Sequence, residues 1–264
     1  MSHSRLFMGR LSIALAFGWL AASNAQADPL TDLRATLARM HANDPFAATL
    51  DVRNTSTNGS SDKPHTTHAE LQLHVEGGSN GLHIGFAPDL LARASQEAEA
   101  HAKNPDVPMP THDLLNELDP ISVQSMLDVA PTLLRKLEGA TLSTQRDEMH
   151  NGKPTHLLVF NIPPGVSSED SDSIKHYEGH LNVWLGADGV PVAMEESRAY
   201  NGRKFFISFE TGMSQSAVLK SIGTRLVAIS RRSENKGSGL GQASDSVDQV
   251  TLTPVAQGAA QPSS

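Results

Sequence analysis

The 264-residue sequence contains no cysteine. This absence excludes a disulfide framework, a thiolate metal site, a cysteine nucleophile and a lipid anchor attached through cysteine. It also suits an oxidising compartment such as a bacterial periplasm, where unpaired thiols react.

Long apolar runs are scarce as well. The longest spans residues 11–22, after Arg5 and Arg10 and before the small residues of an Ala-Gln-Ala tripeptide at 25–27. A positive start, a short apolar run and small residues form a secretory signal peptide, so we expect residues 1–27 to be cleaved on export. An uncleaved N-terminal anchor is the alternative. No other run approaches about 18 residues, so we expect a soluble periplasmic protein without an integral membrane segment.

Basic residues are outnumbered. Beyond residue 27 the chain has 19 lysines and arginines against 29 aspartates and glutamates, a formal charge of −10. Such a chain repels phosphate backbones, so we expect no nucleic-acid partner.

Sequence motifs for catalysis and metal binding are also scarce. There is no H-E-x-x-H pair, and the histidines of "HTTH" (His65 and His68) are two ligands where a zinc site needs three or four. We interpret the histidines as polar-face residues of exposed strands. The acidic stretch 167–173 lacks the glycine and terminal glutamate of a calcium loop. We therefore expect no metal, no cofactor and no enzymatic activity, although a triad assembled from separate strands stays open.

Alternating patterns predict an antiparallel sheet. The first hairpin places Leu71, Leu73 and Val75 on one face and pairs Val75 with Leu82. Asn151-Gly152 is a strong hairpin-turn signal, and "GHLNVWLGADGVPVAMEES" (179–197) reads as another hairpin, with Leu181 and Val183 facing inward and Trp184 outward.

Helices are predicted at two places. Asp28 and Pro29 start one that continues to Met40, and a helical insertion spans about 88–138, kinked or split at Pro131. From residue 233 the chain is rich in Gly, Ser, Ala and Gln, which predicts a disordered tail to 264 with one further strand at 247–253. Residues 28–232 are thus expected to form one domain. The fold class is α+β: a strongly curved antiparallel sheet with helices on its concave face.

Two segments carry a family resemblance: "DEMHNGKPTHLLVFNIP" and "LNVWLGADGVPVAMEESRAYNGRKFFISFE". With Trp184, Asp188, Gly189 and Pro191 at the end and turn of a hairpin, the chain resembles the periplasmic lipoprotein-carrier (outer-membrane lipoprotein sorting) superfamily over about 30–210. The resemblance implies a half-open barrel whose helices plug an apolar cavity for acyl chains, and hence an apolar ligand or a lipidated protein as partner.

The apolar strand faces supply the candidate binding residues. A mostly apolar concavity closed only by helices is where a small molecule binds, although the same residues could form an ordinary core. The function expected is binding of a lipid or other apolar group, carrier-like; the alternative is a partner-binding or envelope-sensor protein without a ligand. The expected cavity lining is Leu71, Leu73, Val75, Leu82, Ile84, Phe86, Leu158, Phe160, Leu181, Val183, Phe205 and Ile207.

Overall fold

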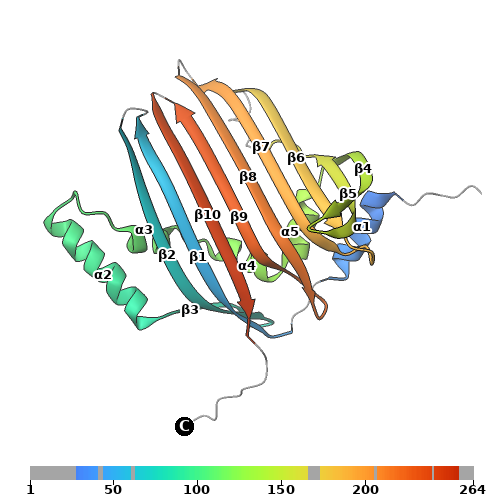
Figure 1. Ribbon diagram of the computed structural model, residues 1–264, viewed down its shortest axis with the longest axis horizontal. Coiled ribbons are helices and arrows are strands. Elements are labelled where there is room, and N and C mark those ends of the chain that lie inside the picture. Colours follow the sequence, from blue (N-terminus) through green and yellow to red (C-terminus); the bar gives the residue numbers. More distant parts are fainter. Residues whose placement is uncertain are drawn as a thin grey trace, which may run out of the picture.

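Ten antiparallel strands form one open sheet in the computed structural model of the protein (Figure 1). Their order is β3-β2-β1-β10-β9-β8-β7-β6-β5-β4, so β3 and β4 are the edges. Neighbours in the sheet are also consecutive in the chain, except that β1 pairs with β10. The strands are β1 Phe46–Ser60, β2 Lys63–Gly78, β3 Gly81–Phe86, β4 Thr141–His150, β5 Lys153–Asn161, β6 Ile174–Leu185, β7 Pro191–Lys204, β8 Ile207–Ile222, β9 Arg225–Gly239 and β10 Gln242–Pro254.

Most of the chain is described by the structure. Four predictions concern residues outside that part: the signal peptide over 1–27, residues 166–172 of the acidic loop, Phe205, and residues 256–264 of the tail. The described residues are 28–40, 44–60, 63–165, 173–204, 207–239 and 241–255.

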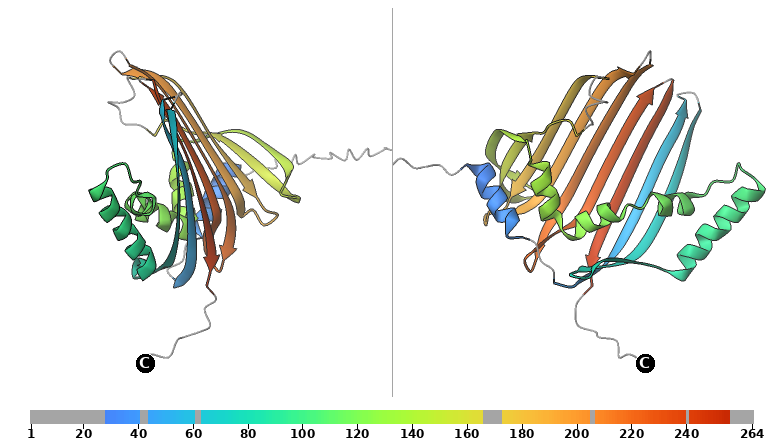
Figure 2. Two further views of the ribbon diagram at one scale, coloured as in Figure 1. Left: turned by 60° about the vertical axis from the view of Figure 1, so that its left-hand side comes forward. Right: turned by 180° about the vertical axis from the view of Figure 1, so that it is seen from behind.

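Five helices lie on one face of the sheet, which we call the inner face (Figure 2). All but one cross the strands near the start of β1; the helix at Pro88–Lys103 lies beyond the β2 edge of the sheet (Figure 1). The opposite strand ends have none of the described helices over them. No described helix is long and apolar enough to cross a bilayer. The helices are α1 Pro29–Ala38, α2 Pro88–Lys103, α3 Pro110–Glu117, α4 Pro120–Leu127 and α5 Val129–Lys136.

The antiparallel sheet and its helices are as predicted, but the predicted curvature is not confirmed. The sheet is neither closed nor strongly curled (Figure 2). Its core lies between the inner face and the helices, where side chains from α1, α4 and α5 pack on those of the central strands.

Helix starts follow the sequence signals. Proline occupies the first position of four helices. An N–H at that position has no partner within the helix, so proline, which lacks the N–H, loses no hydrogen bond there. The Asp28 carboxylate caps α1 by accepting from the Leu30 N–H at 3.2 Å. Asp119 caps α4 by accepting from the N–H groups of Ile121 and Ser122 at 3.0 and 3.1 Å. Such caps stabilise helices by about 1 kcal/mol each.

The predicted helical insertion contains α2 to α5, but its second half breaks at Asp128 and not at Pro131. Pro131 is the third residue of α5, a first-turn position whose N–H would have no intrahelical partner. The first turn of α3 is held by α2, because Glu97 Oε2 accepts from the N–H groups of Thr111 at 2.8 Å and His112 at 3.1 Å.

The first hairpin pairs in a different register from the predicted one. Val75 lies opposite Ile84, not Leu82, and Leu73 lies opposite Phe86. The strands continue to Gly78 and Gly81 and leave a two-residue turn, for which Gly81 adopts a φ of 92°. Two-residue connections are the commonest hairpin turns. A slip of two residues keeps each side chain on its predicted face.

The predicted disorder is wrong for residues 233–239 and 241–246, whereas the strand predicted at 247–253 is confirmed as part of β10. These residues complete β9 and form β10, which lies between β9 and β1 at the centre of the sheet. The low apolar content of this segment is tolerated because its backbone pairs on both sides, and because its apolar inner-face residues Val250 and Leu252 are the ones buried in the core.

Trp184 points to the outer face as predicted, but it is buried. It packs with Leu157 and Ala193 in a small cluster separate from the main core. Its Nε1 donates to Glu148 Oε1 at 2.6 Å, and its ring centroid lies 4.5 Å from that of His150. This cluster joins the β4–β5 hairpin to β6 and β7.

Trp184→Ala is expected to lower the free energy of unfolding by about 2 kcal/mol, the value of one large buried side chain. Urea unfolding followed by circular dichroism measures it. Trp184→Phe keeps the ring and loses the N–H donor, so about 1 kcal/mol is expected. An unchanged midpoint for the alanine variant would show that the cluster does not stabilise the fold.

Candidate functional site

The twelve predicted lining residues are mostly core. Phe86 and Ile207 are 40% and 39% exposed, because Phe86 ends an edge strand and Ile207 lies at the strand ends beyond the helices. Leu82 and Ile84 are partly buried against the core, and Phe205 is outside the described residues. The remaining seven are buried beneath the helices: Leu71, Leu73, Val75, Leu158, Phe160, Leu181 and Val183.

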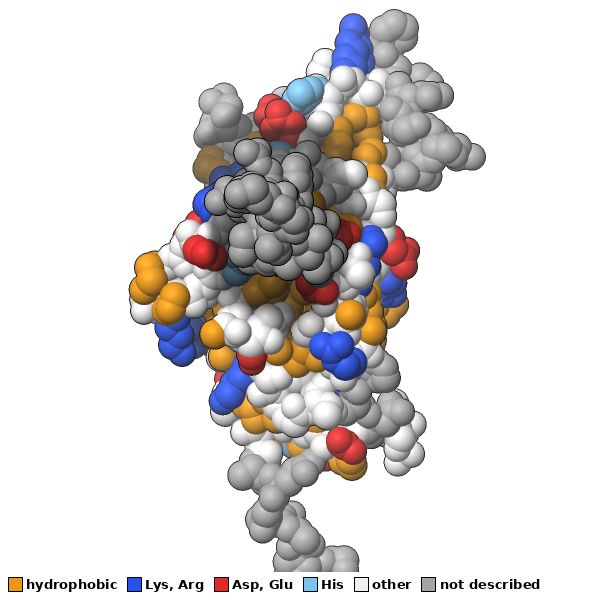
Figure 3. Space-filling view, turned by 90° about the vertical axis from the view of Figure 1, so that its right-hand side faces the viewer, with side chains coloured by type: hydrophobic (Ala, Val, Ile, Leu, Met, Phe, Trp, Pro, Cys, Tyr) orange, Lys and Arg blue, Asp and Glu red, His pale blue; other side chains and the backbone are white. Residues whose placement is uncertain are grey.

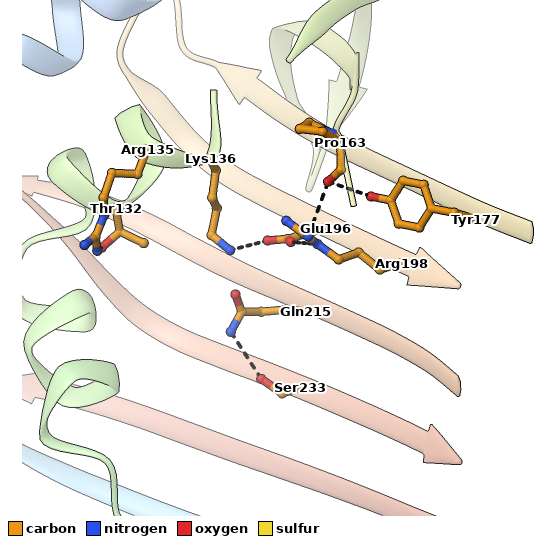
Figure 4. Close-up of polar contacts among 9 residues, drawn as sticks. All are labelled: Thr132, Arg135, Lys136, Pro163, Tyr177, Glu196, Arg198, Gln215 and Ser233. Atoms are coloured by element: carbon orange, nitrogen blue, oxygen red, sulfur yellow. Dashed lines mark hydrogen bonds and ion pairs between the residues drawn. The ribbon is translucent and has the colours of Figure 1, made fainter. Parts of the chain in front are cut away.

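Next to this core, a row of polar side chains crosses five strands on the inner face. Its members lie directly opposite one another in the register of the sheet, strand after strand. Asn54 Nδ2 donates to Asp248 Oδ1 at 2.8 Å. Figure 4 shows the second hydrogen bond of the row, in which Gln215 Nε2 donates to Ser233 Oγ at 3.3 Å. We call this the polar row: Asn54, Asp248, Ser233, Gln215 and Glu196.

An apolar pocket of about 260 Å³ opens where α3 and α4 meet the polar row. Half of its lining residues are polar or charged, among them Ser233, Gln215 and Asp248 of the row together with Arg231. It therefore has an apolar base and a polar mouth. The base is formed by Leu50, Val52, Leu114, Val123, Met126 and Val250.

A polar hollow of about 700 Å³ adjoins this pocket, between the α2–α3 linker and the ends of β1, β2 and β10. Its strand-side lining includes Asn54, Ser56, Ser244 and Ser246. Leu114, Glu117, Asn235 and Asp248 line both spaces, so the two are continuous. We call the apolar pocket and the polar hollow together the inner groove. None of the eleven described residues predicted to line a cavity lines either part.

Arg231 is the described cation in the wall of the apolar pocket. Its Nη1 donates to the Ser122 carbonyl at 3.3 Å and so ties β9 to α4. Burial lowers the pKa of Arg231, and the charges of Asp248 and Asp119 oppose that effect; a guanidinium stays protonated throughout. The hydrogen bond from the Ile121 N–H holds the pKa of Asp119 below its ordinary value, so this carboxylate is ionised at neutral pH.

At the other end of the polar row, a buried carboxylate lies between two cations (Figure 4). Glu196 is 1% exposed and accepts from Arg198 Nε at 2.6 Å and from Lys136 Nζ. Burial raises the pKa of Glu196, but the charges and hydrogen bonds of Lys136 and Arg198 outweigh it, so the pKa lies below its ordinary value. The ion pair fastens α5 to β7.

Tyr177 lies on the inner face near this ion pair (Figure 4). Its hydroxyl lies 2.9 Å from the Ile162 carbonyl and 3.0 Å from that of Pro163, and it donates to this pair. Burial raises the pKa of Tyr177, which keeps the hydroxyl protonated. The ring lies over Gly179, where any Cβ would collide with it, so this position requires glycine.

The histidines of "HTTH" do not converge. His65 lies opposite Asn58 on the inner face, whereas His68 lies opposite Thr55 on the outer face, with His68 Nδ1 3.0 Å from Thr55 Oγ1. Throughout the described ranges, no three histidines, aspartates or glutamates gather in a way that could hold a metal ion. The two histidines of this motif therefore cannot bind the same metal ion.

One string in the sequence, residues 77–81, spells the G-x-S-x-G pattern of a nucleophile elbow. It forms the tip of the β2–β3 hairpin, between two antiparallel strands. A nucleophile elbow is a turn from a strand into a helix, so this string is a hairpin turn.

The chain matches no protein-family model, and no similar protein is found among curated proteins. Function must therefore be argued from the groove itself. Sequence reasoning missed the residues of the groove, although one signal was present: the strands reach 16 residues, against a usual five or six, and their alternation continues in polar residues.

Proposed function

We propose that the protein is an exported, non-enzymatic, carrier-like binding protein that holds a lipid or other apolar group in the inner groove. One observation carries the proposal: a space with an apolar base and a polar mouth persists while all the described helices are docked. An ordinary core would be closed there, since protein interiors leave few voids larger than a water molecule.

The dimensions of the groove support this function. Small-molecule sites commonly occupy about 300–1,000 Å³ and combine an apolar lining with a few polar groups. The apolar pocket is near the lower limit at about 260 Å³, and the polar hollow adds space for a larger polar part. An alkyl chain, free or attached to a lipidated protein, would enter the apolar pocket end-on.

The helices, rather than a half-open barrel, would act as the cover. An open sheet encloses nothing alone, so α3 and α4 must form the second wall of the site. Both are eight residues long, and α3 buries only Thr111 and Leu114. Segments with few buried apolar contacts open at low free-energy cost, so α3 is the element expected to move on loading.

Native mass spectrometry of the protein purified from the periplasm, followed by organic extraction, tests the proposal. We expect an added mass that the extraction identifies as an alkyl-chain species, or uptake of an alkyl-chain ligand on titration. A clean apo mass without uptake would contradict the binding function and favour a partner-binding or sensor protein.

Ser233→Phe is expected to abolish binding, because it fills the mouth of the apolar pocket with a ring. Its matched control is Ser214→Phe on the neighbouring strand β8, where the side chain faces the outer side. The ratio of bound to free protein in native mass spectra measures both. Equal binding by the two variants would place the ligand elsewhere.

A further inference from the structure

The charges around the inner groove are unbalanced. Glu117 and Asp248 line both of its parts, and three further carboxylates belong to the lining. Among the described lining residues Arg231 is the one lysine or arginine. That cation already donates to the Ser122 carbonyl and lies near Asp119 and Asp248. The histidines in the lining are His65 and His101. The further carboxylates are Asp106, Asp113 and Asp119.

This imbalance is local. On the side of the molecule that carries β4, β5 and α1, acidic and basic side chains are interspersed over the visible surface (Figure 3). At the far end of the polar row, Lys136 and Arg198 surround a single carboxylate. The overall acidity of the chain therefore does not account for the groove by itself.

The two carboxylates stand where the apolar pocket opens into the polar hollow. Among the described residues, neither Glu117 nor Asp248 has a lysine or arginine within ion-pair distance, and Asp248 accepts a hydrogen bond from Asn54. A ligand with its chain in the apolar pocket would place its head group against both. A carboxylate or phosphate head would meet like charge there, whereas an ammonium head would be attracted.

We infer that the ligand is a cationic amphiphile, with its alkyl chain in the apolar pocket and an ammonium head group between Glu117 and Asp248. This inference rests on the proposed function, and it adds the class of ligand. Specificity follows from both signs of interaction: the carboxylates attract an ammonium head and reject an anionic one.

Three ligands with the same dodecyl chain test the inference: dodecyltrimethylammonium, dodecyl maltoside and laurate. Each is titrated into the full-length exported protein below its micelle concentration by isothermal calorimetry. We expect the ammonium ligand to bind at least 10-fold more tightly than laurate, with a preference that shrinks as salt is added.

The outcomes separate the two proposals. Binding of all three ligands with laurate equal to or tighter than the ammonium ligand overturns the inference and leaves the proposed function standing. Binding of none of the three overturns the proposed function itself, and the inference with it.

The double variant Glu117→Gln, Asp248→Asn locates the head group. It should weaken the ammonium ligand at least 10-fold and leave dodecyl maltoside unchanged, which also shows that the variant is folded. Its matched control is Glu234→Gln, Asp245→Asn, two carboxylates on the outer face of β9 and β10. Loss of ammonium preference in the control, or its retention in the groove variant, overturns the inference.

Discussion

Leu181→Asp is expected to leave the protein unfolded at neutral pH. Leu181 has no exposed surface and lies on β6 opposite Phe160 and Glu196. The new carboxylate would be buried among apolar side chains, beside a carboxylate whose two cations are already engaged. Burying such a charge costs more than about 5 kcal/mol, which is comparable to the whole stability of an ordinary domain. Far-ultraviolet circular dichroism and urea titration measure the loss.

The adjacent residue provides the control. His180 is exposed on the outer face, opposite Asn161 and Ser197. His180→Asp introduces the same side chain into the same strand and is expected to change stability by less than about 0.5 kcal/mol. If His180→Asp unfolded the protein while Leu181→Asp did not, the faces of β6 would be reversed.

Features that depend on neighbouring residues were predictable from the sequence. The Asn151-Gly152 turn has φ values of 50° and 75° at its two positions, which the two residues tolerate. The Asp28 cap and the proline starts of the helices also depend on a few adjacent residues. The face of each side chain in a hairpin follows from alternation, which is why a slipped register preserved the predicted faces of Leu73 and Val75.

Features that depend on distant segments were not predictable. The two halves of the sheet are joined where β1 pairs with β10, and there Asn54 binds Asp248, which is 194 positions away in the sequence. No local pattern specifies that pairing, and the Gly- and Ser-rich composition of residues 233–254 argued against any strand except 247–253. Sheet curvature is likewise a property of the whole sheet that no local pattern specifies, and the strong curvature predicted from the sequence is not confirmed.

The candidate site was missed for a related reason. Each residue of the polar row looks like an ordinary polar residue within its own strand. Asn54, for example, follows Val52 on the same face and reads as the solvated end of a strand. The row becomes a site only when the register of five strands aligns its members and the cover by α3 and α4 ends beside them.

Glu196→Gln is expected to lower the free energy of unfolding by about 3 kcal/mol. The change keeps the shape of the side chain and removes its charge, so the ammonium of Lys136 and the guanidinium of Arg198 lose their counter-ion. Both cations are mostly buried, with 21% and 17% of their side chains exposed. Removing one partner from a buried ion pair costs about 3–5 kcal/mol, because the remaining charge is left uncompensated. Urea unfolding at pH 7 measures the loss.

The same substitution should change the pH dependence of stability. The pKa of Glu196 in the folded protein lies below its ordinary value of 4.5, so folding favours the ionised form. Its stabilisation is complete above about pH 4.5 and is lost as the pH falls through the lower, folded-state pKa. The wild type should therefore lose stability below pH 4.5 more steeply than Glu196→Gln. Other carboxylates, such as Asp119, affect both proteins equally and cancel in the comparison.

The double variant Lys136→Met, Glu196→Gln separates the ion pair from the shape of the site. If the pair fastens α5 to β7, removing both charges should cost less than the sum of the two single changes, by about 0.5–3 kcal/mol. Amide hydrogen exchange in α5 should then rise in both single variants, since each releases the same contact. Additive losses, or exchange that rises only near Glu196, would mean that the carboxylate stabilises β7 through Arg198 alone and that the core contacts of Leu133 and Ala130 hold the helix in place.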